Sequence, residues 1–190
     1  MKKRFIGAVL GLGLAVAAGG AQAQTLLPVT VEARGGLAFP TGDFADGAKT
    51  GWNAGVDASI GLAPLFSVYG GYEYARFNAK ESSDSHLTDS GFRAGLKVGL
   101  PIVGTVTGIS PYVLGGVIYD KAKATISSGG ISGSGESDWK AGYELGAGTG
   151  IGLGPLLSFT PEVRYRSYKP GDDSSRLSYF QVSMGLQLHL

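Results

Sequence analysis

Residues 139–153 of this sequence alternate between two kinds of side chain. The odd-numbered positions, from Trp139 to Leu153, are almost all apolar, whereas the even-numbered positions are Lys140, Glu144 or glycine. A period of two indicates a β-strand with unlike faces. Glycine is a poor choice for a face exposed to water, but it makes room for neighbouring side chains inside a narrow barrel. The stretch therefore predicts a barrel strand whose glycine face looks inward and whose apolar face looks outward into lipid.

The N-terminus has the layout of a bacterial secretory signal. Residues 1–4 are basic after the initiating methionine, residues 5–18 are mostly apolar, and residues 21–23 (Ala-Gln-Ala) form a small-x-small cleavage site. We expect cleavage after this site, following export through the Sec pathway, so that residues 1–23 are a signal peptide and residues 24–190 the mature domain. The apolar run is shorter than the roughly 20 residues of a transmembrane helix. An uncleaved anchor is the alternative.

Composition excludes several classes of function. The chain contains no cysteine, which rules out disulfides, thiolate metal sites and cysteine catalysis. Its two histidines lie far apart in the sequence, so we expect neither a metal site nor another cofactor. Without the expected signal peptide, 13 basic residues stand against 15 acidic ones, a net charge of about −2. That balance excludes a generally basic nucleic-acid binder.

Alternating segments, separated by turn-forming residues, follow the leader. Their lengths suit tilted transmembrane strands. Backbone groups at an open sheet edge would cost several kcal/mol each in lipid, so the sheet has to close on itself. The sequence therefore predicts an all-β fold, a closed eight-stranded antiparallel up-and-down barrel in the bacterial outer membrane. The eight segments are residues 29–39, 51–62, 65–77, 91–100, 112–125, 139–153, 157–168 and 177–190.

The gaps between these segments also alternate in character. Those after the first, third, fifth and seventh are polar and rich in glycine or serine, and the two tightest follow the second and the sixth. Short periplasmic turns and longer external loops are the outer-membrane arrangement. We expect residues 80–89 and 127–136 to be such polar loops. Pro161 lacks a ladder donor and is expected to cause a bulge or break within its strand.

The facing of residues 112–125 is ambiguous, because two sets of apolar residues compete for the outward face. We favour the even-numbered set, since it sends Lys121 and Lys123 inward, although a bulge would reconcile both sets. The even-numbered set is Tyr112, Leu114 and Ile118, and the odd-numbered set is Val113, Val117 and Tyr119.

Aromatic residues recur at one height on the predicted outward face, next to the polar loops. Seven of the eight segments contribute one, as an interfacial girdle requires. If these aromatic residues were present only because aromatic residues are common in β-strands, they would be scattered along both faces. The girdle consists of Phe39, Trp52, Tyr74, Phe92, Trp139, Tyr165 and Phe180, and a sparser lower ring consists of Phe66, Tyr112 and Phe159.

Charged residues fall on the predicted inward face. Charges within a low-dielectric wall have to be paired or hydrated, and hairpin register offers three pairs: Arg34 with Asp57, Glu73 with Arg93, and Glu144 with Arg164. An eight-stranded barrel is only wide enough for side chains to fill, so we expect a plugged polar lumen. For Lys140 and Arg93, the alternative is that the side chain is solvated at the rim of the barrel and not paired inside it. The expected lumen network is Glu32, Arg34, Asp57, Glu73, Arg93, Lys97, Glu144, Glu162, Arg164 and Arg166.

Taken together, the mature sequence resembles the small outer-membrane β-barrels of the OmpA, OmpX and OmpW type, known as the outer-membrane β-barrel domain family. The resemblance rests on the strand layout and on the phrases at residues 35–44 (GGLAFPTGDF) and 110–117 (SPYVLGGV). The C-terminal strand also resembles the signal by which the outer-membrane assembly machinery recognises such barrels, although the usual terminal aromatic is missing. The matching positions are Ser183, Gly185, Leu188 and Leu190.

Several functions are compatible with such a barrel. The leading hypothesis is a structural or surface-interaction protein that supports the envelope, or that mediates adhesion or loop binding, as a monomer surrounded by outer-membrane lipid. A channel for small or hydrophobic solutes is the alternative that the OmpW-like resemblance allows. A lipid-modifying enzyme has only residues 82–86 and Asp89 as catalytic candidates, and loop composition explains these, so we expect no enzyme. A soluble ligand-binding barrel would instead turn its apolar residues inward.

Overall fold

The structure, a computed structural model, describes residues 27–80, 85–101, 108–128, 131–171 and 175–190. The expected signal peptide, residues 1–23, lies outside the described residues. The elements are β1 (Val29–Thr41), α2 (Asp43–Gly47), β2 (Gly51–Ala63), β3 (Phe66–Asn78), β4 (His86–Gly99), β5 (Ile109–Ser128), β6 (Ile131–Glu136), β7 (Lys140–Gly152), β8 (Leu157–Tyr168) and β9 (Leu177–His189).

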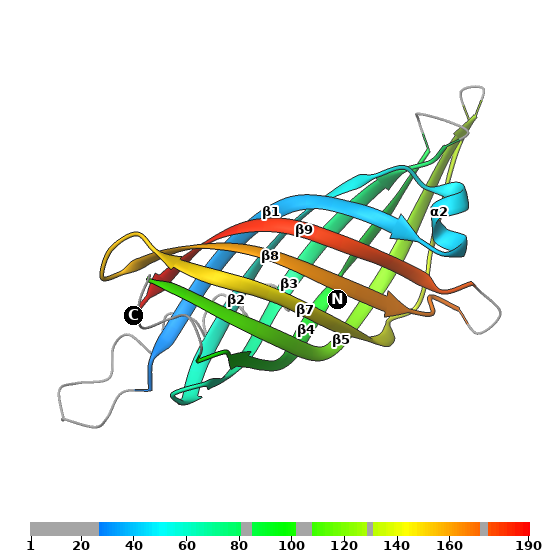
Figure 1. The fold of residues 1–190 in the computed structure, drawn as a ribbon. Helices are drawn as coiled ribbons and strands as arrows, with labels where there is room; N and C mark the ends of the chain where they lie inside the picture. Colours follow the sequence, from blue (N-terminus) through cyan, green and yellow to red (C-terminus); the bar gives the residue numbers. More distant parts are fainter. Residues whose placement is uncertain (1–26, 81–84, 102–107, 129–130, 172–174) are drawn as a thin grey trace, which may run out of the picture.

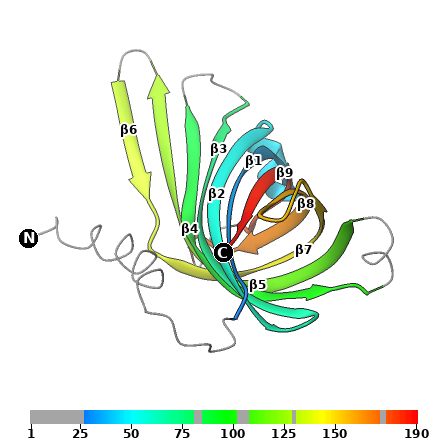
Figure 2. The ribbon, with the colours of Figure 1, turned by 90° about the vertical axis from the view of Figure 1, so that its left-hand side faces the viewer.

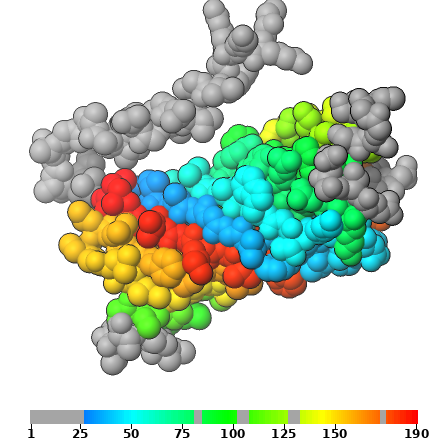
Figure 3. All heavy atoms as spheres, turned by 90° about the horizontal axis from the view of Figure 1, so that it is seen from above, coloured from blue at the N-terminus to red at the C-terminus, as the bar shows by residue number. Residues whose placement is uncertain are grey.

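The strands form one antiparallel sheet that closes on itself (Figures 1 and 2). The first strand pairs with the last, from Thr30 opposite His189 to Thr41 opposite Ser178, and Figure 3 shows these two strands side by side on the surface. Pairing of β4 with β5 completes the ring. The ring order is β1, β2, β3, β4, β5, β7, β8, β9. The predicted closed eight-stranded barrel is therefore confirmed.

β5 pairs along one edge with two separate strands. β7 pairs with the inner part of β5, and β6 pairs with its outer part, where Lys123 lies opposite Glu136. The β5–β6 hairpin extends beyond the barrel wall, as Figure 2 shows, at the same end as α2. We call this the loop end. The C-terminus lies at the opposite end (Figure 1), where β2 and β3 are joined by a tight turn.

The structure corrects the expected loops. β4 begins at His86 and not near residue 91, and β5 and β6 form a hairpin within residues 127–136, which composition had indicated to be a flexible loop. Ladder pairing explains both differences, because His86 pairs with Thr125 and extends the wall outward. Pairing of this kind provides hydrogen-bond partners for the backbone N–H and C=O groups of serine- and glycine-rich segments, whatever their side chains.

Pro161 interrupts the ladder between β7 and β8. The pairing of β7 with β8 stops at Gly148 opposite Glu162 and resumes at Ile151 opposite Phe159, in the same register. The missing donor thus breaks the ladder locally, as expected for proline, while β8 continues its pairing with β9 through Pro161.

The favoured facing of residues 112–125 is wrong. Leu114 is only 4% exposed and lies in the lumen, whereas Val117 is 65% exposed on the outer wall. Tyr112 is likewise buried in the lumen, so it does not belong to the lower aromatic ring. No bulge is involved, because β4 and β5 keep one register throughout. The physical reason is Asp120: the favoured facing would have turned this carboxylate toward lipid, whereas in the structure it is buried in the lumen and paired with Arg166.

The two faces of the wall are inverted relative to a soluble barrel. Outward residues such as Leu145 (57% exposed) and Leu186 (54%) are apolar, while Glu144 and Arg164 are buried inside. The inward glycines of residues 139–153 accommodate large side chains, as expected. A Cβ on Gly142 would overlap with Tyr168, and one on Gly148 would overlap with the Tyr112 ring. Among the described residues, no helix is long and apolar enough to cross a membrane.

Candidate functional site in the barrel lumen

A network of buried ion pairs fills the middle of the barrel. Arg34 on β1 lies 2.8 Å from Asp57 on β2 and 3.0 Å from Glu162 on β8, measured between guanidinium nitrogen and carboxylate oxygen. It also reaches Glu73 on β3 at 3.4 Å. One guanidinium therefore joins carboxylates from three strands, which is the arrangement that a buried cation needs to offset its desolvation.

Two further arginines extend the network around the ring. Arg93 donates from Nε to Asp57 at 2.8 Å and also bonds Glu73. Arg164 donates to Glu144 at 3.0 Å and to Glu162 at 2.8 Å. The structure thus contains all three ion pairs that hairpin register suggests.

Arg166 connects the network to the loop end of the lumen. Its guanidinium lies 2.8 Å from Asp120 and donates to the Tyr179 hydroxyl at 3.0 Å. Asp89 accepts hydrogen bonds from the Tyr179 hydroxyl at 2.6 Å and from the Tyr168 hydroxyl at 2.7 Å. Two tyrosine hydroxyls therefore satisfy Asp89, and Arg166 pairs with one oxygen of Asp120.

All ten residues of the expected lumen network lie inside the barrel. Nine are buried, and the tenth, Lys97, lies toward the C-terminal end with its ammonium group 3.8 Å from Glu32 and 4.3 Å from the centre of the Tyr112 ring. Arg93 is fully enclosed and is not at the rim. Lys140 is half-buried at the loop end of β7.

Sequence reasoning missed part of the network. Asp89 was attributed to a polar loop and Asp120 to a strand of ambiguous facing, yet both are buried in the lumen. The hydroxyls of Tyr69 and Tyr112 also belong to it, since they donate to Glu144 at 2.6 Å and to Glu162 at 2.9 Å. The alternation of inward and outward side chains along each strand identifies these residues, once the facing of β5 and the start of β4 are known.

Contacts between opposite walls cross the lumen. In the ring order, β3 and β8 are four positions apart, and so are β4 and β9. The 3.4 Å contact of Arg166 with Glu73 joins the first pair of strands, and the hydrogen bond from Tyr179 to Asp89 joins the second. Because these side chains span the whole width, they occupy the path that a solute would take.

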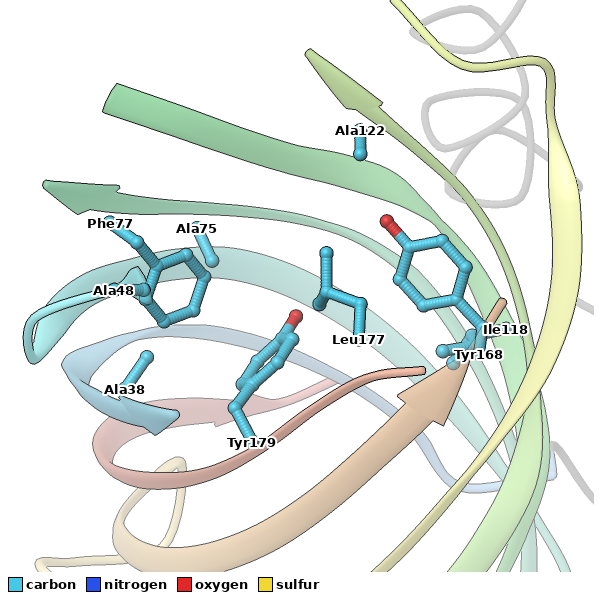
Figure 4. Close-up of a cluster of buried hydrophobic side chains, with 9 residues drawn as sticks. All are labelled: Ala38, Ala48, Ala75, Phe77, Ile118, Ala122, Tyr168, Leu177 and Tyr179. Carbon is cyan, nitrogen blue, oxygen red and sulfur yellow. The ribbon is translucent and has the colours of Figure 1, made fainter. Parts of the chain in front are cut away.

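An apolar cluster covers the network at the loop end (Figure 4). The Phe77 and Tyr179 rings meet edge to face with centroids 5.1 Å apart, and Phe44 of α2 packs on Phe77 at 4.9 Å. The short helix thus adds a third ring above the lumen. The buried members of this cluster are Ala38, Ala48, Ala75, Phe77, Ile118, Ala122, Tyr168, Leu177 and Tyr179.

The outer wall carries aromatic rings near the loop end. Trp139 stacks on Tyr119 and Phe92, with centroids 5.4 Å and 5.9 Å apart. Each of the seven girdle residues lies on the outer wall, and ring contacts or strand pairing link them to their neighbours. The same belt also contains Tyr72, Tyr119 and Tyr143, which the girdle predicted from the sequence did not include. The links are Trp52 with Tyr74, Tyr72 with Phe92, Tyr143 with Tyr165, Tyr165 with Phe180, and Phe180 opposite Phe39.

The structure does not assemble the catalytic candidates. His86 and Asp89 both lie on β4, three residues apart, so they project from opposite faces of the strand. Asp89 is enclosed by two tyrosine hydroxyls. Residues 82–84 lie outside the described residues. His189 at the C-terminal end is 2.9 Å from the Ser158 hydroxyl. Within the described ranges, no group of three or more metal-ligating side chains comes together.

The sequence matches the family model of the outer membrane protein beta-barrel domain over residues 8–187. The chain belongs to this outer-membrane β-barrel family. Membership places it in the bacterial outer membrane, and the inverted faces of the wall are what that location requires. No curated relative matches the sequence.

Solved structures of small outer-membrane barrels share the family's shape. Neisserial surface protein A matches with a TM-score of 0.67 and 13% identity, covering 84% of this chain and 96% of its own. The attachment invasion locus protein Ail of Yersinia pestis matches at 0.58 and 18%, covering 87% and 100%. The N-terminal barrel of Pseudomonas aeruginosa OprF matches at 0.53 and 15%, covering 88% and 100%. At these identities the likeness shows the fold alone.

Proposed function

We propose that this outer-membrane barrel does not conduct solutes and serves as a structural and surface-interaction protein. The observation that carries the proposal is the set of contacts that join opposite walls, Arg166 with Glu73 and Tyr179 with Asp89. A lumen occupied at full width by buried ion pairs gives rigidity to the wall and leaves the loop end as the part that meets other molecules.

The loop end offers a surface suited to such contacts. It carries α2 and the β5–β6 hairpin, which extends beyond the wall (Figure 2). Among barrels of similar shape, Ail of Yersinia pestis has been solved in complex with the heparin analogue sucrose octasulfate. A role in adhesion or ligand binding at the cell surface is the corresponding proposal for this chain, acting as a monomer.

Biogenesis is part of the proposal. The leader at residues 1–23 directs the chain through the Sec pathway, and the assembly machinery recognises the C-terminal strand β9. Outward Leu186 and Leu188 on β9 present an apolar surface to that machinery and to lipid.

Conductance in planar bilayers tests the proposal. The mature chain, refolded and verified as a closed barrel by its heat-modifiable migration on a gel, is expected to produce no steady current steps. A general porin refolded in the same way provides the positive control. Reproducible steps from the wild-type barrel would support the rival function, a channel for small or hydrophobic solutes.

A further inference from the structure

The tight turns at the C-terminal end of the barrel are apolar. The turn between β2 and β3 exposes Leu62, Leu65 and Phe66, and the turn between β7 and β8 exposes Leu153 and Leu156. Leu62 is 55% exposed and Leu156 is 61% exposed, values as high as those of the lipid-facing wall. Because these side chains continue the apolar outer face of the strands, the turns extend a surface that lipid already covers.

Charged residues are absent from this end of the outer surface. The sequence contains no Asp, Glu, Lys or Arg within residues 58–72, 98–119, 145–161 or 177–190, whereas every connection at the loop end contains charged residues. The two ends of the barrel therefore suit different media. The charges that flank the first three stretches all lie in the lumen, and they are Asp57, Glu73, Lys97, Asp120, Glu144 and Glu162.

The C-terminal end also lacks the aromatic residues that mark a membrane interface. Trp and Tyr prefer the headgroup level because their rings combine an apolar body with a polar group, and the belt near the loop end contains both. Among the described residues, the outward aromatic side chains at the C-terminal end are Phe66 and Phe159, which have no polar group. The level of the turns is therefore not marked as an interface.

The backbone of the turns is bonded within the protein. The Leu65 carbonyl accepts from the Gly99 N–H at 2.7 Å, and the Leu156 carbonyl accepts from the His189 N–H at 2.9 Å. Each bond joins a turn to a neighbouring strand end. The two turns also contain Pro64 and Pro155, which have no N–H to satisfy. Backbone that enters lipid has to find its hydrogen bonds inside the protein, and these turns come close to meeting that requirement.

The depth of the turns below the aromatic belt fits the same environment. Trp52 of the belt and Leu62 are ten residues apart on β2, which is about 34 Å along the strand. With a strand tilt of about 40°, this corresponds to a depth of about 26 Å. A hydrocarbon core about 30 Å thick whose outer boundary lies at the belt therefore extends past Leu62 and the turn that follows it.

We propose that the C-terminal end of the barrel is a lipid-binding surface, whose turns are immersed among the acyl chains of the periplasmic leaflet. Continuity with the lipid-facing wall, the absence of charge and the internally bonded backbone support this occupant over an apolar protein of the periplasm. The proposal requires only that the barrel lie in the outer membrane. It is therefore independent of whether the lumen conducts, and the conductance test leaves it unaffected.

Quenching of a single tryptophan tests the depth of the turns. The chain has two tryptophans, and Trp52→Phe with Trp139→Phe gives a background without any. Leu156→Trp then places a reporter in the β7–β8 turn. Lys80→Trp is the matched control, because Lys80 is exposed beyond β3 at the loop end. Each barrel is refolded into lipid nanodiscs, which leave both faces of the bilayer open to solvent, and closure is verified by heat-modifiable migration.

Iodide is expected to quench the Leu156→Trp reporter at least about fivefold more weakly than the Lys80→Trp reporter, because an anion does not enter hydrocarbon. Phosphatidylcholine with brominated acyl chains is expected to quench the first reporter and not the second. Equal quenching of the two reporters by iodide overturns the proposal and leaves the turns as a water-exposed surface for an apolar protein. Protection from iodide without quenching by the brominated chains overturns it as well, since the reporter would then be covered by the barrel itself.

Phe66→Trp in the same background repeats the measurement at the β2–β3 turn with a smaller change of side chain. Both turn reporters are expected to become more accessible to iodide in thin dilauroyl phosphatidylcholine than in thicker dioleoyl phosphatidylcholine, because a thinner core leaves more of the wall uncovered. The Lys80→Trp control is expected to show no such change. Turn reporters whose quenching is the same in both lipids would contradict immersion.

Discussion

At the scale of single residues, inward glycines make space for the buried carboxylates. A Cβ on Gly71 would overlap with the Asp57 carboxylate and with the backbone carbonyl of Val56, neither of which can move without disturbing the wall. A Cβ on Gly35 would meet only the Asn53 carbonyl oxygen, at an ordinary 3.5 Å. Packing therefore requires a glycine at Gly71, whereas a side chain can be accommodated at Gly35.

This difference predicts the result of two alanine substitutions. Gly71→Ala is expected to lower the free energy of unfolding by about 1–3 kcal/mol, the typical cost of overpacking. Gly35→Ala is expected to change it by about 0.5 kcal/mol or less. Urea unfolding of the barrel in lipid vesicles, followed by tryptophan fluorescence, measures both. Equal effects at the two glycines would contradict this account of the inward face.

Arg166 provides a second prediction at this scale. Arg166→Met leaves Asp120 buried without its arginine, while Glu73 keeps Arg34 and Arg93. Removing one partner of a buried ion pair typically costs about 3–5 kcal/mol. The same unfolding measurement should give a loss of this order. Adding Asp120→Asn is expected to recover part of it, because the uncompensated charge is removed.

Arg176→Met is the matched control for Arg166→Met. Arg176 is exposed at the loop end, with its guanidinium 6.0 Å from the Tyr143 ring centre. Its loss is expected to change stability by about 0.5 kcal/mol or less. If both arginines proved equally dispensable, the network would not contribute to stability.

At the scale of elements, the alternation of apolar and polar residues was sufficient to predict the barrel. It did not determine which face of β5 looks inward. β7 and β9 have unlike faces in the sequence, so their orientation could be predicted directly. β5 has apolar residues on both faces, and only contacts distant in sequence, such as Arg166 with Asp120, determine which face looks inward. The β5–β6 hairpin could not be predicted from composition, because backbone pairing and not side-chain pattern holds it together.

The β5–β6 hairpin is expected to be dispensable for the fold. Its outer part pairs only within itself, and Thr125 lies opposite Ser134 at the level where β4 begins. Replacing residues 126–133 by Asn-Gly, which favours a two-residue hairpin turn, should leave a closed barrel that keeps its heat-modifiable migration. Loss of the folded band would mean that the hairpin is needed for closure.

At the scale of the whole molecule, the lumen is closed in layers. The apolar cluster with Phe77 and Leu177 lies at the loop end, the ion pairs lie in the middle, and Tyr69, Tyr112 and Leu114 form a second apolar cluster within the lumen. The stability of each layer depends on closure, because its members come from strands that meet only when β4 pairs with β5. If the barrel does not conduct, as proposed, each of these layers acts as a separate seal.

Layered closure predicts how conductance responds to mutation. Phe77→Ala with Leu177→Ala removes much of the apolar cluster at the loop end, yet the ion-pair layer still spans the lumen through Arg166 and Glu73. This barrel is therefore expected to remain silent in planar bilayers once its folding has been verified. Adding Arg166→Ala, Glu73→Ala and Tyr179→Ala removes both contacts that join opposite walls, and we expect short-lived current steps from folded molecules of that variant. Steady conductance from the first variant alone would show that the apolar cluster is the only seal, and that the ion pairs yield to water and ions.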